Sequence, residues 1–163
     1  MIFSDFDKLA HGPRGTAARH PLYVFKFEPS DGSMTLLNII GDGKDVVNPA
    51  FSRFHPRLNV LYTCTEDIEE NGEIIAYEVG SEGSMIEIGR VDAGGTSTCY
   101  LTLDRDEKNL LAVNYWDSTI VTIPLSTETG NFTGGVISKY DPKGGKALVA
   151  AAKKNGTCCY TCT

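Results

Sequence analysis

Six residues of this chain have side chains that could hold a small polar substrate, and each stands at or near one end of a strand-like apolar run. An arginine within such a run is unusual, because its charge must be paired or hydrated, and it suggests a site for an anion. Amide, carboxylate, thiol and phenol groups at strand ends can orient a substrate through hydrogen bonds. The candidate substrate-binding residues are Asn48, Arg53, Glu66, Cys99, Asn114 and Tyr115.

For several of these residues a purely structural role is the competing interpretation. Glu66 and Asn114 could satisfy backbone groups of the loops that follow them. Tyr115 and the neighbouring Trp116 could stack on a substrate or pack between sheets, and we favour packing for this pair. His55 precedes a proline and is interpreted as a turn residue, not as a catalytic base. The catalytic residue is left unassigned.

The other motifs that carry chemistry are missing from the sequence. There is no Gly-x-Ser-x-Gly, no phosphate-binding glycine loop and no paired cysteine and histidine, so a nucleophilic hydrolase or a nucleotide enzyme has no support. Five cysteines are an odd number for a disulfide framework, and Cys64 and Cys99 lie in apolar runs typical of buried free thiols. The cysteine-rich segment 158–162 lacks a second ligand pair at the spacing that zinc needs. We therefore expect no metal and no other cofactor.

The net charge of the chain and the composition of its first nine residues limit its expected binding partners and its expected cellular location. Fifteen basic and 21 acidic residues leave a net charge of -6, which argues against a nucleic-acid surface because that surface needs a basic footprint. A small anionic substrate is still compatible, since a site can be locally basic on an acidic protein. No run approaches the ~18 apolar residues of a membrane helix. Residues 1–9 contain two aspartates and no apolar core of a signal peptide, so we expect a cytoplasmic protein.

A repeat of 49 residues sets the positions of the candidate residues. Residues 48–66 and 97–115 align without a gap, and in both an apolar strand leads through a charged or proline-containing turn into a second apolar strand. Each later strand of the unit is followed by a glycine-containing turn and a further short strand. The third strand of the unit recurs at 22–27, 73–79 and 119–125.

Four short strands in a unit of this length, rich in β-branched and aromatic residues, are typical of a β-propeller blade. A sandwich of duplicated hairpins is the alternative, but a sandwich does not require constant spacing. The sequence thus predicts an all-β fold, a β-propeller of four-stranded blades with about three blades present. The predicted segments are an irregular lead at 1–21, a partial propeller over 22–152 (a blade end at 22–40, blades at 49–91 and 98–139, the start of another at 145–152) and a non-blade tail at 153–163.

Blade topology sorts the candidate residues between two rims of the propeller. The strands run antiparallel from the channel outward, so the loop entering the first strand and the loop between the second and third strands share one rim. The opposite rim carries the turns at 55–56 and 104–106, whose proline and aspartates suit turn geometry. Arg53 alternates with apolar neighbours on a first strand, so we expect its side chain to enter the channel. The other five candidates fall on the first rim, where concave sites form.

Several short motifs follow one another in a familiar order. The second blade contains Asn48-Pro-Ala-Phe, His55-Pro, Leu61-Tyr-Thr and Gly72-Glu-Ile-Ile-Ala-Tyr, and the third contains Val113-Asn-Tyr followed by Ser118-Thr-Ile-Val. Together they resemble the seven-bladed β-propeller lactonases, the family of 6-phosphogluconolactonases and carboxymuconate cyclases. The resemblance covers about residues 22–150. Where that family often has Pro-Cys-His, this sequence has Thr98, Cys99 and Tyr100.

The resemblance implies a small-molecule lactone as substrate, opened by water with the help of a general base and of positive charge near the developing oxyanion. The first expectation is hydrolysis of a sugar-acid lactone of the 6-phosphogluconolactonase type, a step of the pentose phosphate pathway. The alternatives are a carboxymuconate cycloisomerase and a non-catalytic propeller scaffold that binds a partner. Because 163 residues hold about three of seven blades, we expect a truncated propeller, and its own activity stays open. Open blade edges also predict self-association.

Overall fold

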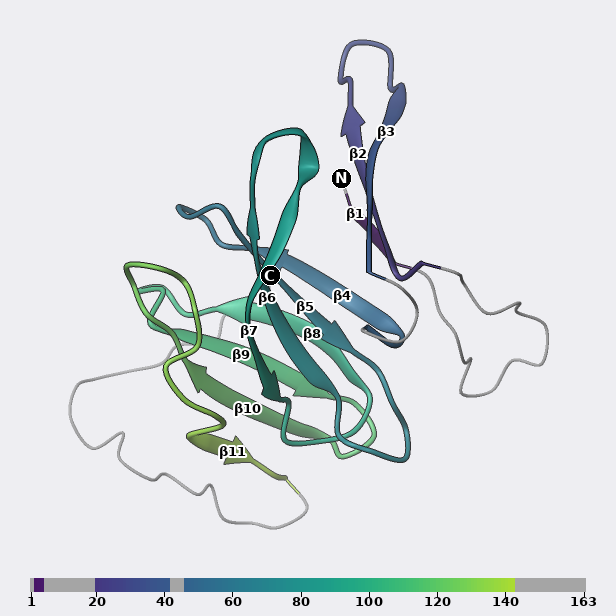
Figure 1. Ribbon diagram of the computed structural model, residues 1–163. Helices are drawn as coiled ribbons and strands as arrows, with labels where there is room; N and C mark the ends of the chain where they lie inside the picture. Colours follow the sequence, from purple (N-terminus) through teal and green to yellow (C-terminus); the bar gives the residue numbers. More distant parts are fainter. Residues whose placement is uncertain (1, 5–19, 42–45, 143–163) are drawn as a thin grey trace.

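The computed structural model describes residues 2–4, 20–41 and 46–142, which form three antiparallel sheets (Figure 1). Within each sheet the strands follow one another in chain order. The first sheet consists of β1 (Ile2–Ser4), β2 (Leu22–Phe27) and β3 (Met34–Ile40). The second consists of β4 (Pro49–Phe54), β5 (Val60–Thr65), β6 (Glu73–Val79) and β7 (Met85–Asp92), with the short 3-10 helix η1 (Ser81–Gly83) between β6 and β7. The third consists of β8 (Thr98–Leu103), β9 (Asn109–Asn114), β10 (Thr119–Pro124) and β11 (Ser138–Tyr140).

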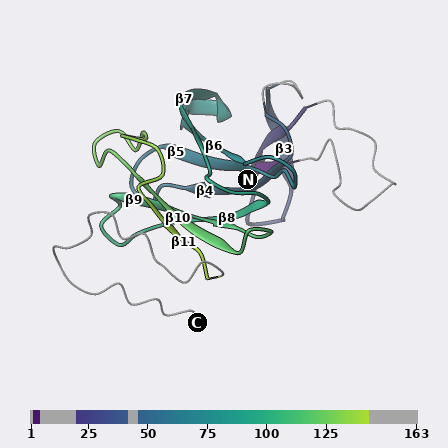
Figure 2. The ribbon, with the colours of Figure 1, turned by 90° about the horizontal axis from the view of Figure 1, so that it is seen from below.

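The three sheets are successive blades that pack face to face. The β4–β7 sheet lies between the other two in both views (Figures 1 and 2). Its innermost strand, β4, contacts β8 of the third blade and β1 of the first. Chain-ordered antiparallel sheets that stack in this way around their first strands are blades of a β-propeller, so the predicted fold is confirmed.

The 49-residue repeat of the sequence is also a repeat of backbone geometry. The strands β4 and β8 begin at Pro49 and Thr98. Both strands carry an irregularity of register at the same place, between Pro49 and Phe51 in one blade and between Thr98 and Tyr100 in the other. A β-bulge of this kind increases the local twist and redirects the side chains beside it.

Burial in the strands reflects how many neighbours each blade has. All six residues of β5 are buried, because the middle blade is covered on both faces. In β9 burial alternates, and Leu110 and Ala112 face the middle blade while the residues between them do not. Two apolar clusters result. One joins the second and third blades around Tyr62, and the other joins the first and second blades around Leu61.

The structure differs from the predicted segments at their ends. The lead 1–21 was expected to be irregular, but β1 lies within it and pairs with β2, Ile2 opposite Val24. An extended segment close to an unpaired strand edge gains backbone hydrogen bonds when it pairs with that edge. A strand of only three residues is too short for its residue pattern to predict such pairing. The last strand of the third blade, β11, reaches Tyr140, one residue beyond the predicted bound. The predicted segments 145–152 and 153–163 lie outside the described residues.

Within the described ranges no helix has the length and apolar character needed to cross a membrane.

Candidate functional site

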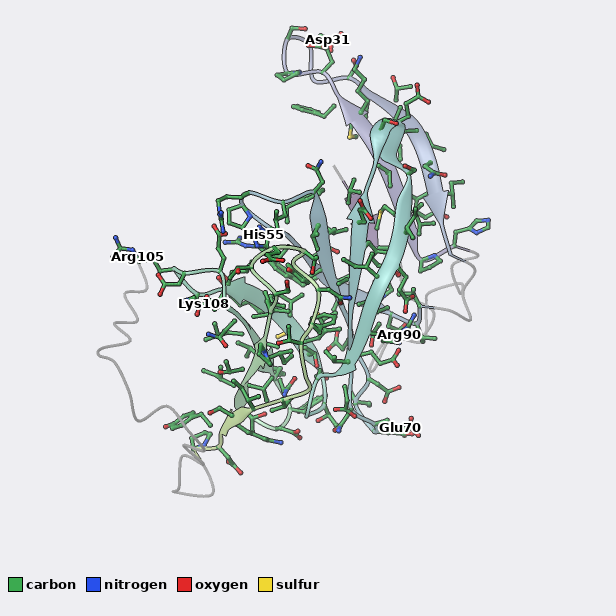
Figure 3. All side chains as sticks on the ribbon, turned by 60° about the vertical axis from the view of Figure 1, so that its left-hand side comes forward. Asp31, His55, Glu70, Arg90, Arg105 and Lys108 are labelled. Atoms are coloured by element: carbon green, nitrogen blue, oxygen red, sulfur yellow. The ribbon has the colours of Figure 1, made fainter. Side chains whose placement is uncertain are left out.

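The predicted site residues lie at two opposite ends of the strands. The first rim is formed by the segments that enter β4 and β8 and by the connections β5–β6 and β9–β10. The second rim is formed by the connections β4–β5 and β8–β9. Figure 3 shows the separation: Glu70 of the first rim lies at the other end of the molecule from His55, Arg105 and Lys108 of the second. By their positions on the strands, Asn48, Glu66, Cys99, Asn114 and Tyr115 belong to the first rim and Arg53 to the second.

The backbone of the first rim repeats from blade to blade. Asn48 and Ser97 stand just before the inner strands with φ angles of 49° and 52°, in the left-handed region that non-glycine residues rarely occupy. The carbonyl of Asn48 accepts the N–H of Glu66 at 2.8 Å, and the carbonyl of Ser97 accepts the N–H of Tyr115 at 2.9 Å. The loops that carry Glu66 and Tyr115 are therefore fixed by the same device in both blades.

Two of the predicted residues, Asn48 and Asn114, are buried and hold the rim together. The amide of Asn48 donates to the carbonyl of Glu66 at 3.3 Å. Asn114 has no exposed surface; it accepts a hydrogen bond from the Thr98 hydroxyl at 2.7 Å and donates to the carbonyl of Ala93 at 3.1 Å. Buried amides satisfied in this way order a loop. For Asn114 the structural interpretation is thus the one that its contacts support.

Glu66 and Cys99 bring a carboxylate and a thiol from neighbouring blades close enough to interact electrostatically. Both side chains are half-buried. Burial raises the pKa of the Cys99 thiol, and the negative charge of Glu66 raises it further. Below this pair, Cys64 is fully buried and donates its S–H to the carbonyl of Thr98 at 3.3 Å; burial raises its pKa to about 12. Both thiols therefore stay protonated at neutral pH and are poor nucleophiles.

An aromatic pair that sequence reasoning missed lies on the inner strands. The rings of Phe51 on β4 and Tyr100 on β8 have centroids 5.0 Å apart and a tilt of 42°. Phe51 and Tyr100 are 49 residues apart, so the repeat could have revealed them as one column of side chains. Tyr100 is 43 % exposed and offers one side of its ring to a ligand or to another protein surface.

The expected packing of Tyr115 and Trp116 between blades is wrong. Their exposed fractions are 67 % and 47 %, and the two rings contact each other with centroids 5.7 Å apart. The physical reason is that both residues lie in the tight turn between β9 and β10, closed by a hydrogen bond from the N–H of Ser118 to the carbonyl of Tyr115, beyond the paired strands that pack between blades. The pair is an exposed aromatic projection of the first rim.

The second rim contains a hollow of about 320 Å³ between the ends of β4 and β8. Arg53 lines this hollow, together with Phe54, Pro56, Leu103, Asp104, Arg105 and Glu107. The turn residues at 55–56 and 104–106 do not by themselves indicate this hollow, because it forms only where the turns of two blades meet. The carboxylate of Asp104 is engaged within its own turn, where it accepts the backbone N–H groups of Lys108 and Asn109 at 2.8 and 3.1 Å.

His55 serves the turn of the second rim, as predicted. Its Nδ1 accepts the backbone N–H groups of Arg57 and Leu58 at 3.2 and 3.1 Å. The ring is buried, and burial lowers its pKa, so the neutral form is favoured. Its Nε2 lies 3.7 Å from the carboxylate of Glu107, which forms an ion pair with Arg57 across the blade interface. Among the described residues no group of three or more His, Cys, Asp or Glu side chains could hold a metal ion, and the cysteines at 158–162 lie outside them.

The fold and the rim define a class of protein: a β-propeller whose potential ligand groups gather where the inner strands begin. Within that class, the chain belongs to the lactonase family of seven-bladed β-propellers, because the profile of this family matches residues 10–147. No match is found among curated protein sequences.

Three known structures show the same fold. A predicted 6-phosphogluconolactonase from Bacteroides fragilis has 18 % sequence identity and a TM-score of 0.69 over 86 % of this chain. One from Bacteroides uniformis has 16 % identity and a TM-score of 0.69, again over 86 %. The periplasmic gluconolactonase of Pseudomonas aeruginosa has 19 % identity and a TM-score of 0.66 over 76 %. This chain covers only 35 %, 36 % and 35 % of those three chains, respectively.

Proposed function

We propose that the propeller to which these three blades belong hydrolyses the lactone of a sugar acid, with 6-phosphogluconolactone as the leading substrate. The observation that carries this proposal is the family match over residues 10–147. The substrate is suggested by the two predicted 6-phosphogluconolactonases that share the fold. Since this chain covers about a third of those proteins, the activity is proposed for the propeller and tested on the chain.

Glu66 is the group that we assign to the proton transfer. It supplies a half-buried carboxylate on the first rim, beside the inner strands. In the proposed reaction Glu66 takes a proton from water as the water oxygen bonds to the lactone carbonyl carbon. The ring C–O bond then breaks, Glu66 returns its proton to the departing ring oxygen, and the open-chain acid leaves. The neutral Cys99 thiol does not compete as a nucleophile.

Phe51 and Tyr100 supply an apolar wall for the sugar ring in this proposal. Their rings contact each other across β4 and β8, and aromatic faces pack well against the C–H groups of a ring. Tyr115 would approach the substrate from the exposed side of the same rim, while Asn48 and Asn114 hold the loops in place.

Arg53 does not share a small ligand with the other five residues. It lies five residues along β4 from Asn48, which corresponds to roughly 16 Å of extended chain. The proposed lactone site therefore uses the five first-rim residues, and Arg53 is assigned to a separate place on the second rim.

The test is hydrolysis of δ-gluconolactone and of its 6-phosphate by the purified 163-residue chain. The measured quantity is the rate of acid release in excess of the uncatalysed rate. We expect hydrolysis of at least one lactone, and a loss of roughly 10²–10⁴-fold in Glu66→Gln. Glu70→Gln is the matched control, because Glu70 is an exposed carboxylate on the same connection and should leave the rate unchanged (Figure 3). No rate with either lactone would contradict an enzymatic role for this chain and favour the scaffold alternative.

A cytoplasmic location and a role in the pentose phosphate pathway stay predictions. The similar gluconolactonase of Pseudomonas aeruginosa is periplasmic, so the fold occurs in more than one compartment. Cell fractionation with an antibody against the chain would test the location directly.

A further inference from the structure

The hollow on the second rim lies between two turns, and its lining residues take no part in the proposed lactone site. Its volume of about 320 Å³ is at the lower end of the range of ligand pockets. One side is formed by the end of β4 and the β4–β5 connection, the other by the end of β8 and the β8–β9 connection. Figure 3 shows this end of the molecule, marked by His55 and Arg105, far from Glu70 of the first rim.

The two turns that frame the hollow are held by the same hydrogen bonds in both blades. The N–H of His55 donates to the carbonyl of Val60 at 2.8 Å. The N–H of Asp104 donates to the carbonyl of Asn109 at 3.0 Å, 49 residues further along the chain. In each turn the side chain of the first residue, His55 or Asp104, also accepts two backbone N–H groups of its own turn. The walls of the hollow are thus fixed in advance, which lowers the cost of ordering them around a ligand.

An ion pair across the blade interface balances the acidic group on one wall. Arg57 of the β4–β5 connection pairs with Glu107 of the β8–β9 connection. The Nε2 atom of His55 lies 3.7 Å from the same carboxylate, is buried and has no hydrogen-bond partner among the described residues. Because Nδ1 accepts backbone N–H groups, Nε2 carries the proton of the neutral ring. The negative charge of Glu107 is therefore compensated within the protein.

Two further cations of the hollow have no such compensation. Arg53 and Arg105 both line it, and neither forms an ion pair with any described residue. The carboxylate of Asp104 also lines the hollow, but it accepts backbone N–H groups of its turn and the amide of Asn109 at 2.6 Å. The hollow therefore carries two uncompensated positive charges beside carboxylates that are already engaged.

The other lining residues are apolar. Phe54 is 50 % exposed, Pro56 is exposed and Leu103 is half-buried. In ligand pockets such side chains contact the body of the ligand, while a few polar groups fix its orientation. A phosphomonoester has about 1.5–2 negative charges at neutral pH and three acceptor oxygens, which matches two guanidinium groups. A single carboxylate would balance only one of them.

We propose that this hollow binds a small phosphomonoester whose organic part is an apolar ring. Arg53 and Arg105 hold the phosphate, because guanidinium groups donate paired N–H groups to phosphate oxygens. Phe54, Pro56 and Leu103 contact the ring. The proposal concerns binding alone. It is independent of the proposed function, since every residue that it uses lies on the opposite rim from Glu66.

The first experiment is calorimetric titration of the purified 163-residue chain with phenyl phosphate. We expect saturable one-to-one binding, with an affinity about 10-fold or more weaker in Arg53→Gln and in Arg105→Gln. Lys108→Gln is the matched control, because it removes one positive charge from an exposed position on the same rim outside the hollow (Figure 3). An equal loss in all three variants would show attraction to net charge only and overturn the site. No binding by the wild-type chain would overturn it as well.

The contact with the ring is tested by changing the ligand and the apolar wall. Phe54→Ser should weaken the binding of phenyl phosphate roughly 10-fold and leave the binding of inorganic phosphate unchanged. Phenol should bind far more weakly than phenyl phosphate. Phenol that bound as tightly would overturn the role of the two arginines, and an unchanged affinity of Phe54→Ser would overturn the apolar contact.

The place of binding is tested by nuclear magnetic resonance. On addition of phenyl phosphate, the backbone amide shifts should concentrate at residues 53–57 and 103–107. Shifts concentrated at 97–99 and 114–117 would place the ligand on the first rim and contradict the proposal. Because Arg53 and Arg105 are exposed, their replacement leaves the core in place, which far-ultraviolet circular dichroism checks. Arg53→Lys keeps the charge without the paired donors and should bind with an affinity between those of Arg53→Gln and the wild type.

Discussion

The hydroxyl of Tyr62 donates a hydrogen bond of 2.5 Å to the backbone carbonyl of Gly130, 68 residues away in the next blade. Tyr62 is fully buried, and burial raises the pKa of its phenol, so the hydroxyl stays a donor over the physiological pH range. This contact joins the core of the second blade to the last turn of the third. It shows that the blade interface is specified by polar as well as apolar groups.

Replacing Tyr62 with phenylalanine removes this hydrogen bond and leaves the buried carbonyl of Gly130 without its donor. We expect Tyr62→Phe to lower the free energy of unfolding by about 1–3 kcal/mol, as is usual for an unsatisfied buried acceptor. Urea unfolding followed by tyrosine and tryptophan fluorescence measures this change. Tyr115→Phe is the control, because the exposed Tyr115 ring should give a change within about 0.5 kcal/mol. Equal effects of the two variants would show that the hydrogen bond contributes nothing.

His55 makes stability depend on pH. Its pKa in the folded chain lies below its usual value of 6.5, mainly because the ring is buried. As the pH falls below that value, the unfolded chain binds a proton that the folded chain does not, so stability is complete above it and decreases below it. The protonated ring would also lose Nδ1 as the acceptor for Arg57 and Leu58. Unfolding free energies should therefore fall between pH 7.5 and pH 5.5.

The variant His55→Asn separates this effect from that of other groups. The side-chain oxygen of asparagine can accept the same turn N–H groups but does not titrate. We expect the fall in stability between pH 7.5 and pH 5.5 to be smaller in this variant than in the wild type. An unchanged pH dependence would rule out His55 as its source.

Gly72 allows the close approach of two blades. A Cβ atom at this position would lie 2.5 Å from the carbonyl oxygen of Thr65 and 2.6 Å from the Thr98 hydroxyl. Since backbone must shift to admit a methyl group, we expect Gly72→Ala to lower the midpoint of thermal unfolding by several degrees, corresponding to roughly 1–3 kcal/mol. Gly135→Ala is the matched control, since nothing lies within 4 Å of a Cβ there. A stabilised Gly72→Ala chain would show that the loops have room to move.

Asn114 connects three segments of the first rim through one buried amide. We expect Asn114→Ala to cost about 2–4 kcal/mol, because it leaves the Thr98 hydroxyl and the Ala93 carbonyl unsatisfied. Asn59→Ala, at an exposed position, should be nearly neutral. The measurement is again urea unfolding. If Asn114→Ala were as stable as the wild type while losing lactone hydrolysis, the amide would have a ligand role instead of a structural one.

The strands of this chain could be predicted well from residue patterns alone. The 49-residue spacing places Asn48 and Ser97 before equivalent strands, and the structure gives both the same rare backbone conformation. The resemblance to propeller lactonases is confirmed over residues 10–147. These features depend on neighbours within one repeat, where apolar alternation and turn residues act directly on the backbone.

The candidate site could be predicted only in part. Sequence reasoning placed Glu66 and Cys99 on one rim, but it expected Tyr115 and Trp116 to be packed and missed the Phe51–Tyr100 pair. The hollow beside Arg53 was missed as well, since residues of two blades line it. Where two blades meet, the exposure and contacts of a side chain depend on residues about 49 positions away in the sequence. A local residue pattern does not indicate how close those residues lie in space.

The amino-acid sequence by itself therefore determined the blade: its strands, its turns and the rim on which each polar group stands. Only the tertiary structure decided which groups of neighbouring blades meet, such as Tyr62 with Gly130 and Phe51 with Tyr100. The physical reason is that strand formation follows from short-range alternation and turn chemistry, whereas burial follows from the stacking of whole sheets. It is the same stacking that leaves Leu111 and Val113 half-exposed while their counterparts, Tyr62 and Cys64, are buried.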